Sequence, residues 1–296
     1  MINSRGAVRV RHFPCYVFLD AIPAVNYPIL HIRNRPQLGA WFDPHRGRTV
    51  PEFSRGMAAA AGEGAGSGEI LNLKTAQDVV DFWFGNDLAR LASDKEYGQS
   101  FGAKWFGAGP PDQAFIGTQN ASKDLMAKAG SGELKGEDWE TPNGALARLL
   151  LLDQFPRTVY RGTSQAFATD ETAASLALEI ISKGWDTVDA QNYTFQQRLF
   201  VYLPLMHSEK IEAQDAGVSK CQALVDDEVK ATGSANSAVD DHAKEHRGVV
   251  AKFGRFPHRN APLGRESTPE ELEWLSSDNV PEWAKSQGTP APSPPS

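Results

Sequence analysis

The chain has 296 residues, of which 41% are hydrophobic and 23% charged, an ordinary composition for a globular protein with one large core or two small ones. Its net charge of −7 argues against a protein that binds nucleic acid mainly through the phosphate backbone. No run of about 18 apolar residues occurs, so we predict no membrane span. The two cysteines, Cys15 and Cys221, lie far apart in different contexts, which argues against a disulfide framework and favours a reducing compartment.

The first 56 residues differ in composition from the rest of the chain. They contain eight Arg, no Lys, six Pro and three acids, which gives a net charge of +5 and leaves −12 for the remainder. Met57 then opens MAAAAGEGAGSGE, which is typical of a second chain start followed by a flexible linker. We predict a low-order extension and linker over residues 1–69. Three interpretations of the extension stay open: a transit segment, a non-native extension of the gene model, or a disordered tail. If Met57 is the true start, we expect a cytoplasmic protein; if residues 1–56 are a transit segment, we expect an organellar one.

Residues 70–285 carry a helical pattern, and we predict one all-α domain of about nine helices there. The expected helices lie near residues 75–84, 95–106, 110–130, 142–155, 169–183, 221–230, 239–253 and 268–274, with one more that begins at 194. Residues 286–296 are rich in Pro and Ser, and we predict a disordered tail.

Capping signals and prolines set the expected helix ends. Thr75 with Asp78 and Thr194 with Gln197 resemble capping boxes, Thr141 precedes Pro142, and Thr268 precedes Pro269 and Glu271. We expect Pro156 to stop the helix of residues 142–155, because a proline ring disfavours helical geometry in the residue before it. We expect Pro204 to kink or split the helix that begins at 194.

Asp153 continues a stripe of leucines along one face of the predicted helix of residues 142–155. An acid in such a place has to be paired or neutral. Arg157 and Arg161 are the nearest cationic partners, and Gln154 adds an amide. The pattern fits a functional site, and it also fits a structural ion pair that ties a helix end to its loop.

A second polar group, His207, Ser208 and Glu209, follows closely after Pro204. A proline-broken helix frees backbone carbonyls and allows side chains to converge, which suits a ligand or catalytic site. His207 has the chemistry of a general base near neutral pH. The three neighbours do not form a nucleophilic triad, because adjacent helical residues point in different directions.

His242 and His246 share a helical face at a spacing that can hold a metal ion, with Asp240, Asp241 or Glu209 as further ligands. The spacing alone is weak, because it recurs by chance and no HExxH pattern is present.

The stretch FGRFPHRN, residues 253–260, places Arg255, His258 and Arg259 between aromatic rings and a proline, and Asn260 closes it. Pro257 is expected to turn the chain and display these side chains. Asp153 and Glu209, from two other helices, or a bound anion are the expected partners of the positive charges.

Three segments together resemble the domain-of-unknown-function family 924. They are LLDQFPRTVYRGTSQAFATD (151–170), YLPLMHSEKIEAQ (202–214) and HRGVVAKFGRFPHRNAPLGRESTPEE (246–271), and DFWFG (81–85) resembles the start of the family. The resemblance covers about residues 78–275. It implies an all-helical array similar to tetratricopeptide (TPR-like) repeats, with no established activity. His242 departs from the family pattern, where an aromatic residue is usual, so we predict no metal site.

Three function classes fit the matched residues. The first is a binding module whose DQFPR, HSE and FGRFPHRN motifs line a pocket for an anionic small molecule or an acidic peptide terminus, held by bidentate arginine contacts. The second is a hydrolase or lyase that acts on an anionic substrate, and the third is a purely structural ion-pair network. We predict no cofactor, no nucleic acid and no membrane partner, and we leave the oligomeric state open.

Roles follow from these classes. In the enzyme, His207 or His258 is the acid–base group and Glu209 orients it. The predicted ligand-binding residues are Asp153, Gln154, Arg157, Arg161, Ser208, His246, Arg255, Arg259 and Asn260.

Overall fold

The computed structural model describes residues 73–102, 105, 120–233, 238–278 and 280–287. These ranges are helical and contain no strand, so the prediction of an all-α domain is confirmed. The predicted extension of residues 1–69, residues 110–119 of the third expected helix and residues 288–296 of the tail lie outside the described ranges. The TPR-like arrangement of the helices stays a prediction.

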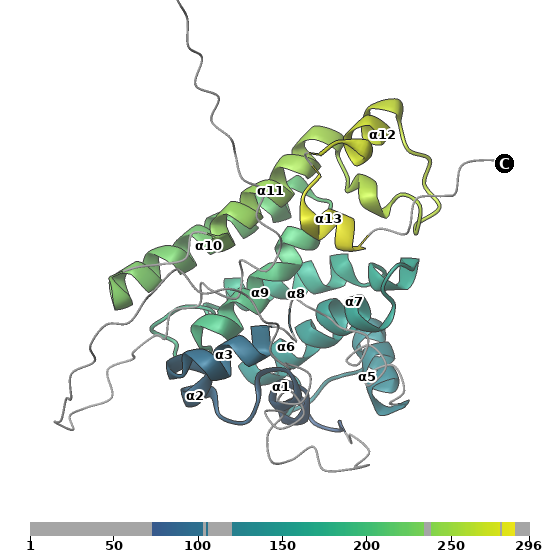
Figure 1. Ribbon diagram of the computed structural model, residues 1–296. Coiled ribbons are helices and arrows are strands. Elements are labelled where there is room, and N and C mark those ends of the chain that lie inside the picture. The colour runs from purple at the N-terminus through teal and green to yellow at the C-terminus, as the bar shows by residue number, and fades with distance from the viewer. Residues whose placement is uncertain (1–72, 103–104, 106–119, 234–237, 279, 288–296) are drawn as a thin grey trace, which may run out of the picture.

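Twelve α-helices and three shorter helical segments are described (Figure 1). In chain order they are α1 (Ala76–Phe84), α2 (Leu88–Ser93), α3 (Lys95–Gly102), α5 (Asn120–Ser131), α6 (Pro142–Leu149), the π-helix η3 (Leu150–Gln154), α7 (Phe155–Val159), η4 (Ser164–Ala166), α8 (Asp170–Ser182), α9 (Phe195–His207), α10 (Ile211–Thr232), α11 (Ala238–Phe253), η5 (Pro257–Arg259), α12 (Pro269–Ser276) and α13 (Glu282–Gln287). Among them α10 packs against both α9 and α11, and α6 packs against α1, α8 and α9. None of these helices combines the length and the apolar composition that crossing a bilayer requires.

The predicted helix starts are confirmed at four threonines. Thr75, Thr194 and Thr268 each accept a hydrogen bond from the backbone N–H of the residue three positions later. The side chain of that later residue accepts in turn from the backbone N–H of the threonine. Thr141 accepts from the N–H of Gly144. Each cap satisfies backbone donors that a helix start leaves unpaired, and is worth about 1 kcal/mol.

Pro156 does not stop its helix, contrary to the prediction. The chain passes from α6 through η3 into α7, where Pro156 lies in the first turn and its missing N–H is tolerated. A proline here removes the usual backbone donor to the carbonyl of Leu152, four residues earlier. The hydroxyl of Thr169 donates to that carbonyl instead, so the helical path continues to Val159.

The expected split at Pro204 and the expected start of the helix at 221 need correction, and two short helices were not predicted. Helix α9 runs unbroken across Pro204 and ends at His207, so the proline does not split it. The helix expected at 221–230 is the second half of α10, which already begins at Ile211. Helices α2 and α13 have six residues each, too few to show an apolar period in the sequence.

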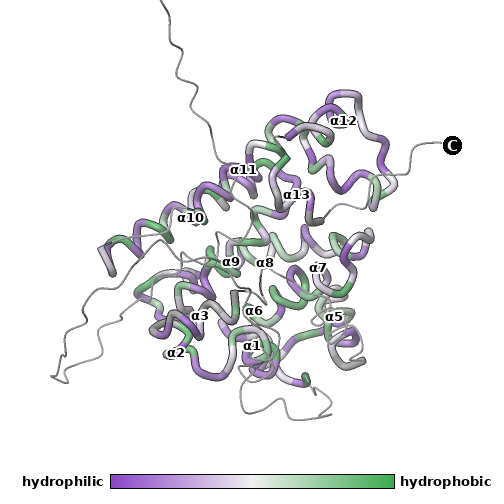
Figure 2. The backbone as a smooth tube through the Cα atoms, viewed as in Figure 1, coloured by the Kyte–Doolittle hydropathy of each residue, from purple (hydrophilic) through white to green (hydrophobic). Residues whose placement is uncertain are grey.

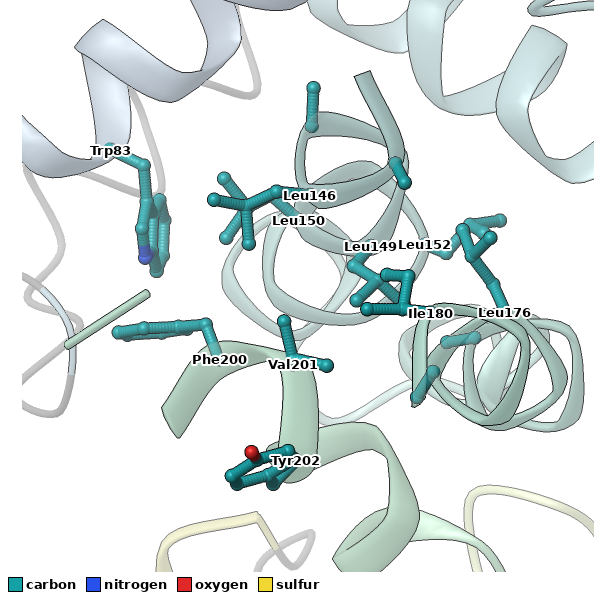
Figure 3. Packing of buried hydrophobic residues seen from close by; sticks show 14 of the residues in the cluster. Trp83, Leu146, Leu149, Leu150, Leu152, Leu176, Ile180, Phe200, Val201 and Tyr202 are labelled. Atoms are coloured by element: carbon teal, nitrogen blue, oxygen red, sulfur yellow. The ribbon is translucent and has the colours of Figure 1, made fainter. Parts of the chain in front are cut away.

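The main core surrounds the leucine-rich end of α6 and η3. Figure 3 shows Leu146 and Leu150 on the side that faces Trp83 of α1, and Leu149 on the side that faces Ile180 of α8. All of these side chains are at most 2% exposed. Because burying one large apolar side chain contributes about 1.5–3 kcal/mol, this cluster fixes the position of the helix segment that follows it.

A smaller apolar cluster lies near the C-terminal end of the described chain. It consists of Val249 and Val250 of α11 with Phe256, and the partly buried Trp274 and Trp283 pack against it. In Figure 2 hydrophobic and hydrophilic residues alternate along α10 and α11, which fits helices with one buried face.

Gly144 marks a close approach of α6 to the turn before it. A Cβ atom at this position would lie 2.5 Å from the backbone carbon of Trp139 and equally close to its Cα atom. We expect Gly144→Ala to lower the free energy of unfolding by about 1–3 kcal/mol, because backbone cannot move aside as a flexible side chain can. Chemical denaturation of the full chain measures the change.

Gly248 of α11 provides the matched control. An added Cβ there meets nothing within 4 Å, and the residue is exposed in mid-helix. Gly248→Ala should raise the free energy of unfolding by about 0.5–1 kcal/mol. Equal effects of the two substitutions would contradict the tight packing assigned to Gly144.

Candidate functional site

The carboxylate of Asp153 lies at the centre of a buried polar cluster. The residue belongs to η3 and is 1% exposed. Its Oδ1 atom lies 2.8 Å from Nδ1 of His207 and 2.8 Å from Nη1 of Arg157, and the Gln154 amide donates to Oδ2. The leucine stripe therefore ends in a fully paired acid, and Arg157 is the cation that pairs with it.

A second buried carboxylate, that of Asp170, joins two arginines. Arg157 donates to both of its oxygens at 2.9 and 2.8 Å, and Nη1 of Arg259 lies 3.0 Å from Oδ2. The Arg259 guanidinium also lies over the rings of Phe167 and Phe256, 4.7 and 4.4 Å from their centroids, where aromatic faces stabilise a cation. Two carboxylates and two guanidiniums thus alternate from η3 to η5.

Asp170 was not predicted as a site residue. In the sequence it stands at an expected helix start, where the helix dipole alone explains an acid. Charge balance is the signal that could have found it. If both Arg157 and Arg259 are buried, Asp153 supplies only one of the two acids that they need.

The backbone around His207 is fixed at the end of α9. Gln214 of α10 donates to the carbonyls of Met206 and Ser208, at 2.7 and 2.6 Å. An ionised Asp153 accepts from the Nδ1–H of His207, which leaves Nε2 as the basic ring nitrogen. No hydrogen-bonding group among the described residues contacts that Nε2 atom.

Two more imidazoles lie beside His207. The ring centroids of His207 and His246 are 6.1 Å apart, and Nδ1 of His246 lies 2.8 Å from the carbonyl of His242. The ring of His258 lies 5.5 Å from that of Phe256, which in turn lies 5.9 Å from His246. We call His207, His246 and His258 the imidazole centre.

The charges of the cluster decide the protonation of the imidazole centre. Burial alone would raise the pKa of Asp153, but Arg157 and His207 outweigh it and lower that pKa to about 2. Burial lowers the pKa of His207, and the charge of Arg157 lowers it further against the opposing effect of Asp153. Burial also holds the pKa values of His246 and His258 well below the usual value. The three imidazoles are therefore neutral at pH 7.

Arg255 and Asn260 form a separate group with Glu271 of α12. Arg255 donates to both oxygens of Glu271, at 2.7 and 2.8 Å, and the Asn260 amide donates to one of them at 3.0 Å. The hydrogen bond to Arg255 is the main cause that lowers the pKa of Glu271 to about 2. This group ties the loop after η5 to the start of α12.

Glu209 binds the other end of the FGRFPHRN stretch. It accepts from the backbone N–H of Phe256 at 2.9 Å and forms an ion pair with Arg265 at 2.8 Å. Within the described residues Glu209 makes no hydrogen bond to His207, and the carboxylate that orients this imidazole is that of Asp153.

Ser208 and Arg161 lie at the edge of the cluster. The hydroxyl of Ser208 donates to Glu171 at 2.8 Å, and Glu171 pairs with Lys210 at 2.8 Å. Arg161 is half-buried, and burial lowers its pKa. The structure thus divides the predicted site residues into the Asp153–His207 cluster, the Glu271 group, the Glu209 pair and the Ser208 pair.

No group of three His, Cys, Asp or Glu residues in the described part of the chain is arranged to hold a metal ion. His242 lies 3.2 Å from Glu245 on its own helix. The arrangement is suited to hydrogen bonding and proton exchange at the imidazole nitrogens.

Comparisons with known proteins support the fold, and the proteins that match have no known function. Residues 79–279 match the family described as "Bacterial protein of unknown function (DUF924)". The fold is similar to the solved structure of a protein of unknown function, ATU0120 from Agrobacterium tumefaciens, with 38% sequence identity and a TM-score of 0.52. The alignment covers 68% of this chain and 96% of that one. No curated protein matches the chain.

The Asp153–Arg157–Asp170 chain predicts a large stability effect. We expect Arg157→Ala to lower the free energy of unfolding by about 3–5 kcal/mol, because it removes the cation between two buried carboxylates. Lys183→Ala, which removes an exposed pair with Glu179, should change it by less than about 1 kcal/mol. Denaturant titration compares the two, and a similar small effect of both would contradict the buried network.

The neutral imidazoles predict a loss of stability in mild acid. The unfolded chain binds protons on its histidines below about pH 6.5, whereas folding lowers the pKa values of His246 and His258. Stability from these groups is therefore complete above about pH 6.5 and declines below it, by up to about 1.4 kcal/mol per pH unit for each proton. Thermal unfolding between pH 8 and pH 5 measures this decline.

His258→Asn should flatten that decline even if it lowers stability at pH 8. Gly248→Ala, which removes no titratable group, is the control and should leave the pH dependence unchanged. An equally steep decline in His258→Asn would show that this imidazole does not contribute.

Proposed function

We propose that this chain, which belongs to the DUF924 family, binds a small anionic ligand at the imidazole centre and takes up a proton on His207 as it does so. The observation that best supports this proposal is the orientation of the His207 ring. Its Nδ1 atom is held by Asp153 at 2.8 Å, while Nε2 has no hydrogen-bonding partner among the described residues.

The surrounding charges favour an anion. After burial, the charges of Arg259 and Arg157 lower the pKa of His258, and the charge of Arg157 also lowers the pKa of His207. An anion placed against Nε2 of His207 would oppose this positive potential and raise the pKa of His207. Asp153 on the opposite ring nitrogen would stabilise the resulting imidazolium.

The arginines contribute charge rather than direct contacts in this proposal. Arg157 and Arg259 are engaged by Asp170, and Arg255 is engaged by Glu271. A ligand held by bidentate arginine contacts would have to displace these carboxylates. Recognition through imidazole nitrogens requires no such exchange.

Two buried polar atoms on η5 are consistent with a polar ligand. Nδ1 of His258 and Nε of Arg259 are both buried, and neither has a hydrogen-bond partner in the described part of the chain. An unmade hydrogen bond at a buried polar group costs about 1–3 kcal/mol. A small ligand with several oxygen atoms would offset part of that cost.

Calorimetry with a panel of anions tests the proposal. The panel contains phosphate, sulfate, acetate, citrate, and a short peptide with either a free or an amidated C-terminus. We expect at least one anion to bind with uptake of about one proton, and affinity to fall by up to about tenfold per pH unit above the pKa of bound His207. Buffers with different ionisation enthalpies give the proton count.

The variants separate binding from stability. His207→Gln keeps a polar group near the Nε2 position but cannot take up the proton, so binding should weaken and lose its pH dependence. His242→Gln is the control and should bind as the parent does. Absence of binding by every anion between pH 6 and pH 8 would contradict the proposal and favour a purely structural ion-pair network.

A second candidate function is acid–base catalysis on an anionic substrate, by a hydrolase or lyase. The Asp153–His207 pair favours it, because a carboxylate on Nδ1 orients an imidazole whose Nε2 accepts a proton. His207 would be the base and Asp153, in place of Glu209, the orienting residue. Consumption of a bound anion by the parent chain and not by His207→Gln would distinguish an enzyme from a binding protein.

We retain the expectation of a cytoplasmic protein, with an organelle as the alternative if residues 1–56 are a transit segment. N-terminal sequencing of the native protein tests it.

A further inference from the structure

Trp283 of α13 covers two members of the imidazole centre. Its indole is stacked on the ring of His246, with centroids 3.8 Å apart and planes at 16°. It meets His258 edge-on at 5.4 Å and Phe256 edge-on at 5.7 Å. One side chain therefore covers a face of His246 on α11 and also contacts His258 on η5.

Side-chain contacts attach the short helix α13, which carries Trp283, to its neighbours. The helix has six residues, and it packs against η5. Val280 and Ala284 are buried on either side of Trp283, at 6% and 1% exposure, while the indole itself is partly exposed. A helix this short is marginal by itself, so its side-chain contacts hold it in place.

The position of α13 in the chain sets it apart from the rest of the site. The family match ends at residue 279, before the helix begins, whereas all the predicted site residues lie inside it. The centre itself rests on α9, α11 and η5. Asp153 holds His207 of α9, Glu209 holds the backbone of Phe256 before η5, and Asp170 holds Arg259 of η5. Removing α13 from its place would leave those hydrogen bonds intact.

We infer that Trp283 is an access-determining residue, which covers His246 and His258 in the imidazole centre and moves aside with α13 when a ligand enters. The indole occupies one face of His246 and lies 5.4 Å from the ring of His258, so its removal would widen access to both rings. The entry role rests on the proposed function, whereas the covering of His246 and His258 does not require any ligand. Local opening of a short terminal element has a low free-energy cost compared with global unfolding.

Chemical modification of histidine tests the covering without a ligand. Diethyl pyrocarbonate acylates neutral imidazole nitrogens, and mass spectrometry of peptides gives the rate at each histidine of the full chain. In the parent, His246 and His258 should react more slowly than the more exposed His242. In Trp283→Ala their rates should rise by about tenfold or more and approach that of His242, because local protection is lost.

Trp283→Phe is the second variant, because it keeps an aromatic ring on His246 and should retain most of the protection. Circular dichroism and the thermal midpoint establish that both variants fold. Unchanged rates at His246 and His258 in Trp283→Ala, or equal rates for all three histidines in the parent, would overturn the inference. If Trp283→Ala does not fold, Trp283→Leu replaces it, because leucine keeps apolar bulk but has no ring to stack on His246. Faster labelling of His246 in Trp283→Leu than in Trp283→Phe then supports the inference, and equal rates contradict it.

Binding experiments with the anion panel distinguish failure of this inference from failure of the proposed function. If an anion of the panel binds, its association rate should rise in Trp283→Ala, and an unchanged or lower rate would contradict the entry role. If no anion binds but the labelling pattern changes as expected, the proposed ligand fails while Trp283 still covers the centre.

Discussion

The contact between Asp153 and its two partners, Arg157 and His207, is the interaction on which the rest of the site depends. The carboxylate lies in a helix segment whose leucines are held by the main core, so it cannot move toward solvent. A buried charge of this kind is stable only when it is paired. Arg157 supplies the opposite charge, and the same pairing leaves His207 with one ring nitrogen bound and the other available.

Backbone geometry places these partners where they can meet. The π-helical turn before Pro156 and the hydroxyl of Thr169 carry the helix past the proline, so Asp153 and Arg157 stay on one continuous helical path. The Thr169 bond also brings the start of α8 to this path. Asp170, the residue after Thr169, accepts a hydrogen bond from Arg157. The hydrogen bond that carries the helix past Pro156 therefore also brings Asp170 into the charge network.

The pairing of the arginines limits what the site can do chemically. Arg157, Arg255 and Arg259 each meet a carboxylate of the chain, so they stabilise the arrangement of η5, α8 and α12 as well as setting the local potential. Among the described residues, His207 and His258 each keep a ring nitrogen without a hydrogen-bond partner, and so does the Nε atom of Arg259. We therefore propose proton exchange at the neutral imidazoles as the chemistry of the centre.

The sequence by itself determined the helical class, the four capped helix starts, the family and the pairing of Asp153 with a nearby arginine, because these depend on local periodicity and on the cost of burying a charge. Only the tertiary structure decided which acid meets which base over longer separations. The sequence predicted Glu209 as the residue that orients His207, whereas helix packing brings Asp153 to it across 54 positions. The same holds for Asp170 and Trp283, whose roles depend entirely on side chains from other helices.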